Sequence, residues 1–378
     1  MKHEIAIIGG GPAGSTAAFY LAKYGYDVCL IEKKTFPRDV LCGEFLSKEI
    51  LENLKQLGLF TDFLSLQPNP INSFKICDNK NEITVDLGFQ AYGMKRSTFD
   101  NLLLENIRSK GVTVYQPCEV TDIIRSEHSF TLQLRSKANY PKEIISRYVI
   151  AAYGKRNLLD SKLNREYISH KSNLNGIKFH VNKTYLKNFR NDQIQIYADD
   201  GIYCGVNLVN DNEVTFCFLE DRQNSSRTPI QSLNNLAGHN EKFRCLFTSG
   251  IENTFQSSRI YGSGNIYFGR RHQVENGIFT IGDAAQVIAP LAGDGISMAM
   301  DSAKLLADLF QLKKKNDISD NELYGIYSRD WKRKFEKRLI TARFIQKALF
   351  KKIGRRIGLG GLKYFPLALD YFIKSTRG

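Results

Sequence analysis

Long apolar runs, paired cysteines and hydrolase motifs are all missing from this sequence. No stretch approaches the roughly 20 apolar residues that a membrane-spanning helix needs. The seven cysteines are scattered and include no CxxC pair, so we predict reduced thiols, no disulfide framework and no metal site. No Ser/His/Asp triad, HExxH or Walker pattern is present and the six histidines do not cluster, so we expect any reaction to depend on a bound cofactor.

An even spread of charge is missing as well. The net charge is +14, but residues 1–328 carry 38 basic and 36 acidic side chains, whereas residues 329–356 carry twelve basic and two acidic ones. The basic character therefore belongs to one segment near the C-terminus, and we expect no nucleic-acid partner. That segment is either the solvated face of a helix packed on the protein body, or a site of peripheral contact with anionic lipid.

Length and composition indicate a globular protein of two or three domains. With 378 residues, 42% of them hydrophobic and 24% charged, the chain is long enough for a sizeable core. The sequence enters an apolar strand within its first residues and shows no cleavable signal. We therefore expect a cytoplasmic protein, peripheral at the membrane surface if the basic segment binds lipid, and either a monomer or a homodimer.

The chain is organised around a glycine-rich turn at residues 9–14. An apolar run typical of a buried parallel strand ends in Gly9-x-Gly11-x-x-Gly14, and a helix rich in small residues follows. This spacing allows a tight turn, close approach of the backbone to a pyrophosphate, and packing of helix on strand. A second apolar strand ends at Glu32, about 20 residues further on, where a carboxylate can accept hydrogen bonds from a ribose. We predict a dinucleotide site formed by Gly9, Gly11, Pro12, Ala13, Gly14, Glu32 and Lys33.

The segment after Glu32 carries a family resemblance. Residues 36–39, Phe-Pro-Arg-Asp, and residues 42–47, Cys-Gly-Glu-Phe-Leu-Ser, resemble a segment of the geranylgeranyl reductase family, which belongs with the FAD-dependent monooxygenases (flavoprotein hydroxylases) and flavin-dependent halogenases. The resemblance implies that this loop, too irregular for a helix or strand, passes along the isoalloxazine ring. It implies cofactor contacts from Arg38, Cys42 and Gly43, and makes Cys42 and Glu44 the candidate catalytic side chains. The alternative is that Cys42 only packs and Glu44 only caps or pairs.

A second glycine-bearing corner lies near the other end of the chain. An apolar strand ends in Gly-Asp at residues 282–283, and a proline loop leads to a helix that begins in the glycine cluster 293–296. A carboxylate at a strand end suits the hydroxyl groups of a ribityl chain, and the free N–H groups of a helix stabilise negative charge on a flavin ring. Both corners resemble those of the flavoprotein hydroxylases, which implies FAD rather than NAD. The predicted contacts here are Gly282, Asp283, Pro290, Gly293, Gly295 and Ile296.

Two further positions match the family, one of them beside a departure. Arg96, before a helix predicted to reach about residue 110, resembles the arginine that these families place near the FAD pyrophosphate; the alternative is a surface charge. The hydroxylases carry an Asp-Gly pair where this chain has Tyr153 and Gly154, so Gly154 is kept as a predicted contact while the mode of flavin reduction is left open. The tryptophan and Phe-Pro of the isoprenoid reductases are missing near Tyr203, and the only tryptophan, Trp331, rules against a halogenase segment.

The predicted fold class is α/β, a Rossmann-like FAD-binding domain of the GR2 type with an inserted β-rich substrate domain and C-terminal helices. The FAD-binding domain is expected at residues 1–70, 93–170 and 256–318, and the substrate domain at residues 71–92 and 171–255. Residues 319–378 are expected to be helical, with a capping box at Ser319, a glycine-rich break at 354–361 and a last helix at 366–375. Ser47 is expected to cap a helix over residues 48–57.

The predicted activity is an FAD-dependent redox reaction on a small hydrophobic substrate. We favour a monooxygenase acting on an apolar or aromatic metabolite with NAD(P)H as ultimate donor, because the isoprenoid-reductase motif is missing. The donor is expected to dock transiently, since no second glycine motif for a resident NAD(P)H is present. Two alternatives stay open: an ene reductase of the geranylgeranyl reductase type acting on an isoprenoid or polyene, and an inactive relative that binds a membrane or nucleic acid.

Overall fold

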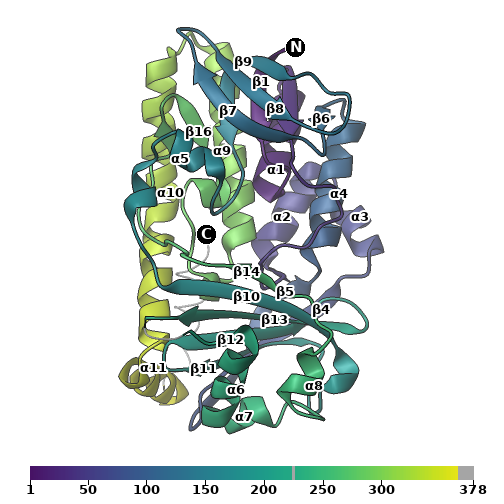
Figure 1. Ribbon diagram of the computed structural model, residues 1–378, viewed down its shortest axis with the longest axis vertical. Helices are drawn as coiled ribbons and strands as arrows, with labels where there is room; N and C mark the ends of the chain where they lie inside the picture. Colours follow the sequence, from purple (N-terminus) through teal and green to yellow (C-terminus); the bar gives the residue numbers. More distant parts are fainter. Residues whose placement is uncertain (224–225, 365–378) are drawn as a thin grey trace.

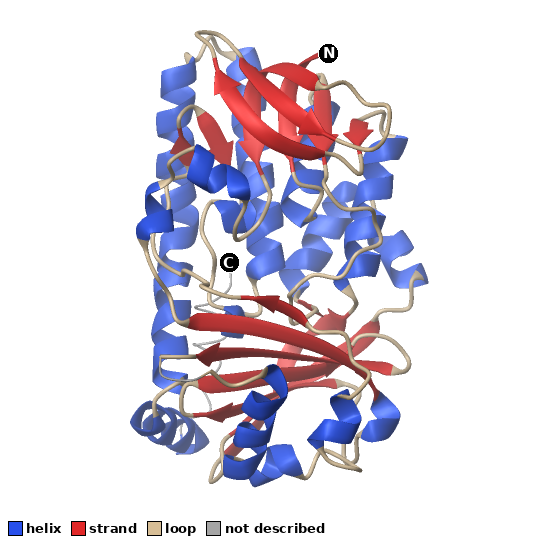
Figure 2. Cartoon of the chain, viewed as in Figure 1, coloured by secondary structure: helices blue, strands red, loops and turns tan. Residues whose placement is uncertain are grey.

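Two β-sheets and the long helices beside them form the frame of the molecule. A computed structural model of the chain describes residues 1–223 and 226–364. The sheet that contains the N-terminus lies at one end of the molecule and a second sheet crosses the other end (Figure 1). Helices lie behind the first sheet, between the two sheets and on the outer side of the second (Figure 2).

The first sheet is largely parallel because its central strands are apolar along most of their length. β1 (Lys2–Ile8) pairs in parallel with β2 (Val28–Ile31) and with β9 (Glu143–Ala151). Strands covered on both faces require such continuous apolar runs. The order is β15-β16-β9-β1-β2-β6, and β8 and β7 continue the sheet from β9 as the predicted meander. The other bounds are β6 Thr113–Tyr115, β7 Glu119–Arg125, β8 Phe130–Arg135, β15 Val274–Glu275 and β16 Ile278–Thr280.

The main core joins this sheet to a layer of helices. Buried Ile5 and Ile7 of β1 share one apolar cluster with Ala17 and Leu21 of α1 and Leu306 of α9. The small residues of α1 allow it to pack closely between the sheet and α9. The helices of this part are α1 Pro12–Lys23, α2 Lys48–Leu57, α3 Phe60–Ser65, α4 Arg96–Ser109, α5 Leu158–Lys162 and α9 Gly295–Lys315.

The second sheet is built mainly from the two segments predicted to be β-rich. Its order is β14-β10-β13-β12-β11-β4-β5-β3, and the pairs are antiparallel except for β11 with β4. Three short helices cover its outer face through a cluster rich in phenylalanine. The bounds are β4 Asn69–Cys77, β5 Glu82–Gly93, β10 Leu174–Asn182, β11 Gln193–Asp199, β12 Ile202–Leu208, β13 Glu213–Asp221, α6 Pro229–His239, α7 Glu241–Arg244 and α8 Ile251–Phe255.

Two short strands join the second sheet from segments that the predicted division assigns to the cofactor unit. β3 (Phe45–Leu46) pairs with β5, and β14 (Tyr261–Ser263) pairs with β10. β3 corrects the expectation that residues 33–47 contain no regular element, because two residues are too few to leave a periodic pattern. Ser47 does occupy the N-cap position of α2, but its hydroxyl makes no capping hydrogen bond. The two sheets are therefore connected more closely than the sequence implies.

The C-terminal part consists of α10 (Asp320–Leu349) and α11 (Lys352–Tyr364). The predicted capping box is confirmed, since Ser319 Oγ accepts a hydrogen bond from the Glu322 N–H and the Glu322 carboxylate accepts one from the Ser319 N–H. The predicted break at residues 354–361 is wrong, because α11 continues through these glycines. The expected helix at 366–375 lies outside the described residues. Within the described ranges, no helix is both long and apolar enough to cross a membrane.

Candidate active site

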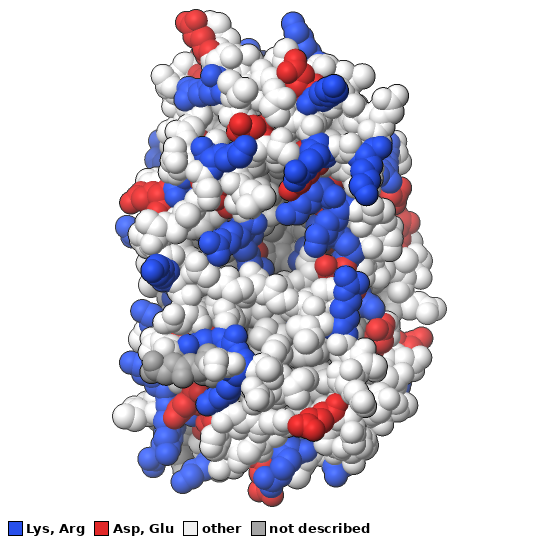
Figure 3. Space-filling model, viewed as in Figure 1, with Lys and Arg blue, Asp and Glu red and all other residues white. Residues whose placement is uncertain are grey.

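Both glycine-bearing corners open onto one cavity of about 1160 Å³ between the two sheets. Figure 3 shows a recess near the middle of one face, with Lys and Arg side chains around it. Every predicted cofactor-contact residue lies on the cavity wall except Gly14 and Gly282. The wall residues among them are Gly9, Gly11, Pro12, Ala13, Glu32, Lys33, Arg38, Cys42, Gly43, Arg96, Gly154, Asp283, Pro290, Gly293, Gly295 and Ile296.

The N-terminal corner brings a helix start to the cavity with very little backbone clearance beneath it. A Cβ atom at Gly14 would lie 1.9 Å from the carbonyl oxygen of Gly9, so only glycine allows α1 to pack on β1 here. Gly11 is the N-cap of α1, with no side-chain cap and no acidic residue in the first turn. The N–H groups and positive dipole end of α1 are therefore available to an anionic group in the cavity.

Two arginines line the wall beside this helix start. The Asp100 carboxylate, fully buried, accepts hydrogen bonds from Arg96 at 2.7 and 2.8 Å and from Arg38 Nη1 at 3.3 Å. Burial opposes the charge of Arg96, but the Asp100 carboxylate outweighs it and raises the Arg96 pKa. A Cβ atom at Gly11 would lie 3.9 Å from an Nη2 atom of each arginine. Arg96 is thus part of the wall, which fits the predicted pyrophosphate contact better than the surface-charge alternative.

Glu32 occupies the predicted place at the end of β2. Its carboxylate is buried and accepts hydrogen bonds from the N–H groups of Gly10 and Lys34, both at 2.8 Å. These bonds fix the carboxylate at the edge of the cavity, where each oxygen still has a lone pair to offer. Its contact with a ribose remains a prediction.

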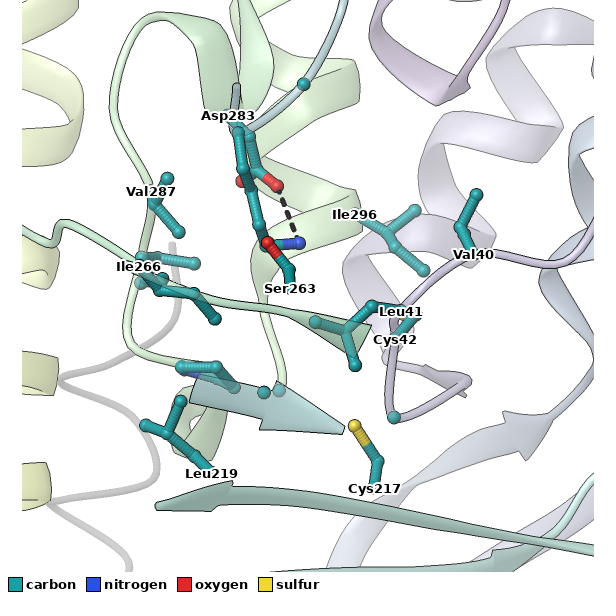
Figure 4. A pocket seen from close by; sticks show the side chains of 18 of the residues that line it. Val40, Leu41, Cys42, Cys217, Leu219, Ser263, Ile266, Asp283, Val287 and Ile296 are labelled. Atoms are coloured by element: carbon teal, nitrogen blue, oxygen red, sulfur yellow. Dashed lines mark ion pairs between the residues drawn. The ribbon is translucent and has the colours of Figure 1, made fainter. Parts of the chain in front are cut away.

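The second corner presents a carboxylate and another helix start to the same cavity. Asp283, in the turn after β16, forms an ion pair with Lys155 at 3.1 Å (Figure 4). Burial opposes the charge of Lys155, but Asp283 outweighs it and raises the Lys155 pKa. The N-cap of α9 is Asp294, whose side chain turns away from the helix start to bind Arg338 of α10 at 2.9 Å. The α9 N–H groups therefore remain available near the cavity.

Glu44 forms a buried ionic cluster that joins the loop of residues 33–47 to the second sheet. Its carboxylate accepts hydrogen bonds from the Arg96 N–H and Lys178 Nζ at 2.9 Å, and lies 2.5 Å from His180 Nε2. Burial opposes the charge of Glu44, but the His180 hydrogen bond and the Lys178 charge outweigh burial and lower its pKa. Glu44 is the one non-glycine residue of this loop with a positive φ, 58°.

The two candidate catalytic residues therefore differ in their surroundings. Glu44 is a fixed anion with three partners, which suits a positioning residue better than a proton donor. Cys42 is half-buried on the cavity wall, and its Sγ accepts a hydrogen bond of 3.4 Å from the Glu44 N–H. Cys217 points toward this loop from β13 (Figure 4), and burial raises its pKa to about 12.

The residues Asp39, Glu44 and His180 could in principle hold a metal ion, because their ligand atoms lie within 4.8 Å of one another. The Lys178 ammonium already occupies this cluster, 2.9 Å from Glu44 and 3.7 Å from Asp39. A second cation would meet its repulsion, so we assign no metal here.

Sequence reasoning missed Lys178 and His180, and it missed most of the cavity floor. The two residues are two positions apart on β10, in a run for which the sequence predicted a strand and no functional residue. Side chains two apart share one face of a sheet, and the same spacing repeats along the neighbouring strands. The floor is formed in this way by Phe74, Ile76, Ile194, Ile196, Tyr203, Gly205, Cys217 and Leu219.

Tyr153, which replaces the aspartate of the hydroxylase pair, also lines the cavity. Its hydroxyl donates to Asp160 at 2.7 Å and accepts from Arg165 at 3.3 Å. Tyr153 thus stands where the hydroxylases have an aspartate, but the carboxylate of Asp160 lies next to the Tyr153 hydroxyl. Trp331 is buried in α10 beside Phe335 and is not among the cavity-lining residues.

The wall residues fit a flavin dinucleotide. The starts of α1 and α9 are not capped by a side chain, and two guanidinium groups are fixed beside the first of them. These groups can stabilise the negative charges of a pyrophosphate and of a flavin ring. Gly11 has no side chain, so a pyrophosphate can come close to the backbone there. Arg38, Arg96 and the α1 N-terminus would hold the pyrophosphate, and Asp283 the ribityl chain. FAD would supply two-electron transfer in the middle of the cavity.

A largely parallel sheet whose two glycine-bearing corners open onto one cavity defines a dinucleotide-binding protein. The chain belongs to the FAD binding domain family, whose model matches residues 2–330. It is 24% identical over 345 residues to digeranylgeranylglycerophospholipid reductase of Methanosarcina acetivorans, covering 87% of this chain and 80% of the relative. It is therefore an FAD-dependent oxidoreductase of the superfamily that includes monooxygenases, halogenases and geranylgeranyl reductases.

Solved structures agree on the fold. The flavin-dependent brominase Bmp2 superposes with a TM-score of 0.77 at 18% identity, covering 100% of this chain and 93% of the brominase. The protein pqsL of Pseudomonas aeruginosa, described as a probable FAD-dependent monooxygenase, gives 0.73 at 16% identity and covers 96% of this chain and 100% of its own. At these identities the likeness concerns the fold alone.

Proposed function

We propose that the protein is a flavin monooxygenase that acts on an apolar or aromatic molecule. The observation that carries this proposal is the part of the cavity next to the expected flavin position, above the floor described earlier; we call it the chamber. Its floor is apolar and presents no carboxyl group among its described residues. Ile194, Ile196, Leu219 and Ile266 form its surface, and Tyr203 contributes a phenol. An apolar substrate would leave this chamber free of water, which protects reactive oxygen chemistry from side reactions.

The protein's own groups would hold and orient the reactants. Asp283, with Lys155, and the α9 N-terminus fix the flavin end, while Glu44 anchors the loop that covers it. Burial raises the pKa of Tyr203 well above its ordinary value, so its hydroxyl stays protonated and can donate a hydrogen bond to a substrate oxygen. NAD(P)H would reach the flavin by transient docking from solution.

An ene reductase is the second candidate, and Cys42 is the observation in its favour. Reduction of a double bond needs a proton donor near the substrate, and Cys42 is a thiol on the cavity wall beside the flavin position. Glu44 does not supply that proton, because its carboxylate is ionised and bound by three groups. The reductase among the relatives also supports this candidate.

The test supplies two probes to the flavin-loaded protein with NADH or NADPH: 4-pentylphenol as an apolar aromatic compound and geranylgeraniol as a polyene. A monooxygenase incorporates ¹⁸O from ¹⁸O₂ into 4-pentylphenol and gives no product without oxygen. Saturation of geranylgeraniol under strict anaerobiosis, abolished by Cys42→Ala, would establish the reductase instead.

A further inference from the structure

Four large apolar side chains are exposed close together in sequence where α10 meets α11. Ile340 and Phe344 of α10 are 51% and 68% exposed, and Ile353 and Ile357 of α11 are 74% and 71% exposed. Isolated exposed apolar residues are common, but a group of them on adjacent helices marks an interaction surface. We call the surface formed by these four residues, together with four exposed cations, the C-terminal corner. The cations are Lys347, Lys351, Lys352 and Arg356.

The exposure belongs to a fixed helix and not to one loosely attached. Arg355, on the inner side of α11, is 4% exposed and binds the Leu349 carbonyl at 2.9 Å and Asp200 at 2.7 Å. Leu359 is buried against the chamber floor in the same cluster as Ile196. With Arg355 and Leu359 turned inward, Ile353 and Ile357 are directed outward.

Six cations of this region divide into two sets, and a seventh, Arg343, donates a hydrogen bond of 3.2 Å to the Leu339 carbonyl. Arg338 and Arg355 form ion pairs within the protein, Arg338 with Asp294 and Arg355 with Asp200. Lys347, Lys351, Lys352 and Arg356 are exposed, and within the described part of the chain none of the four has an acidic partner within 4 Å. The apolar residues of the corner therefore lie among four cations that no described acidic residue neutralises.

The corner also borders the cavity. Phe344 and Ile357 belong both to the exposed group and to the cavity wall, and Ile345, Leu349 and Leu359 continue the apolar lining inward. An apolar path thus leads from the corner to the chamber beside the flavin position.

We propose that the C-terminal corner docks on an anionic lipid bilayer. Phe344, Ile353 and Ile357 enter the headgroup region, and the four cations bind lipid phosphates. Charge complementarity and the apolar side chains point to lipid together, because a nucleic acid would use the cations and leave the isoleucines in water. The edge of the cavity at Phe344 and Ile357 then faces lipid, and an apolar molecule can pass into the cavity there without crossing water. This inference does not depend on which redox reaction the flavin performs.

The test is flotation of the full-length, flavin-loaded protein with vesicles. Vesicles of phosphatidylglycerol and phosphatidylcholine in equal parts should bind the protein at low salt, and pure phosphatidylcholine should bind it far less. The quadruple variant K347E/K351E/K352E/R356E should lose more than about 100-fold in partitioning, since loss of each cation alone removes a factor of roughly five and the four new carboxylates are repelled by the anionic surface. Phe344→Ser with Ile357→Ser should weaken the binding that remains at high salt.

A matched control reverses four other exposed lysines, K80E/K110E/K137E/K142E, and should keep vesicle binding. Flavin absorbance and melting temperature of each variant show that it is folded. The proposal is overturned if the control loses as much as the corner variant, or if the wild-type protein ignores anionic vesicles. It is equally overturned if a duplex DNA displaces the vesicles through the same residues, or if the corner variants convert a dimer into a monomer, because a nucleic acid or a second copy would then be the occupant.

Discussion

At the scale of single residues, neighbours decide what a carboxyl group can do. Glu44 was a candidate catalytic residue because a family segment places it near the flavin. The sequence predicted that Glu44 lies on the loop beside the cofactor. It did not predict the partners of Glu44, because Lys178 and His180 come from a strand more than 130 residues away. A positive φ at Glu44 turns the side chain into that strand. The resulting cluster fixes the loop that covers the cofactor position.

Replacing Glu44 by Gln should destabilise the protein by about 3–5 kcal/mol at pH 7, because Lys178 would stay buried without its nearer counter-charge and keep only Asp39 at 3.7 Å. A carboxyl group whose pKa is lowered on folding stabilises the fold above its unfolded pKa and ceases to do so as the pH falls through the folded pKa. The difference between wild type and Glu44→Gln should therefore shrink below about pH 4.5, the ordinary value for this group. Urea unfolding across pH measures it.

An exposed carboxylate provides the control for this variant. Glu241→Gln removes one partner of a surface pair with Arg244 and should change stability by less than about 0.5 kcal/mol at any pH. A Glu44→Gln protein that unfolds like the control would mean that the buried cluster does not hold the loop.

Gly14→Ala should cost both stability and flavin. The added methyl group would meet the Gly9 carbonyl oxygen at 1.9 Å, so α1 must move away from β1 and from the pyrophosphate position. Overpacking of this kind costs about 1–3 kcal/mol. Gly238→Ala, where a Cβ atom meets nothing within 4 Å, should be neutral or slightly stabilising. Thermal melting and the ratio of flavin absorbance at about 450 nm to protein absorbance distinguish the two, since FAD is the cofactor that absorbs there.

At the scale of elements, α11 shows how contacts override local preference. Glycines at 354, 358 and 360 argue against a helix, since each costs about 1 kcal/mol relative to alanine. The sequence therefore predicted a break. Arg355 and Leu359 supply tertiary contacts that hold the helix, and Gly354 lies so close to the Ala348 carbonyl that a Cβ atom would be 2.3 Å away.

Arg355→Gln should loosen α11 without unfolding the protein. The substitution removes the ion pairs with Asp199 and Asp200 and leaves these carboxylates without their buried cation. Amide hydrogen exchange over residues 352–360 should rise at least tenfold, while exchange in β1 stays unchanged. Arg356→Gln, one residue on and exposed, is the matched control and should leave exchange as in wild type.

At the scale of the whole molecule, the sequence indicated the ends of the cofactor site better than its floor. The two glycine corners follow from local chemistry, and they do share one cavity. The floor depends on which strands lie side by side, and the parallel pairing of β11 with β4 joins residues 73–77 to 193–197. No local pattern reports such a pairing. The two-residue strand β3, which pairs with β5, was missed because it is too short to leave a periodic pattern.

Removal of FAD should therefore weaken the whole protein. A ligand at 100 times its Kd stabilises the folded state by about 2.7 kcal/mol. At about 2–4 °C per kcal/mol for a domain of 150–250 residues, the apoprotein should melt roughly 5–10 °C below the flavin-loaded form. Differential scanning calorimetry before and after flavin removal, with FAD added back, measures the shift. Equal melting temperatures would mean that FAD does not bind the folded protein at the concentration used.

The long helix α10 touches both sheets. Near its start, Tyr327 donates a hydrogen bond of 2.7 Å to the carbonyl of Thr280, the last residue of β16 in the first sheet. Just past its end, the Phe350 carbonyl accepts one from the Gly201 N–H, in the turn between β11 and β12 of the second. Because α10 is bonded to the first sheet near its start and to the second sheet just past its end, it resists a hinge rotation of one sheet relative to the other. Exchange of substrate and product is then left to small movements of side chains at the rim, and turnover should change little when solvent viscosity slows large domain motions.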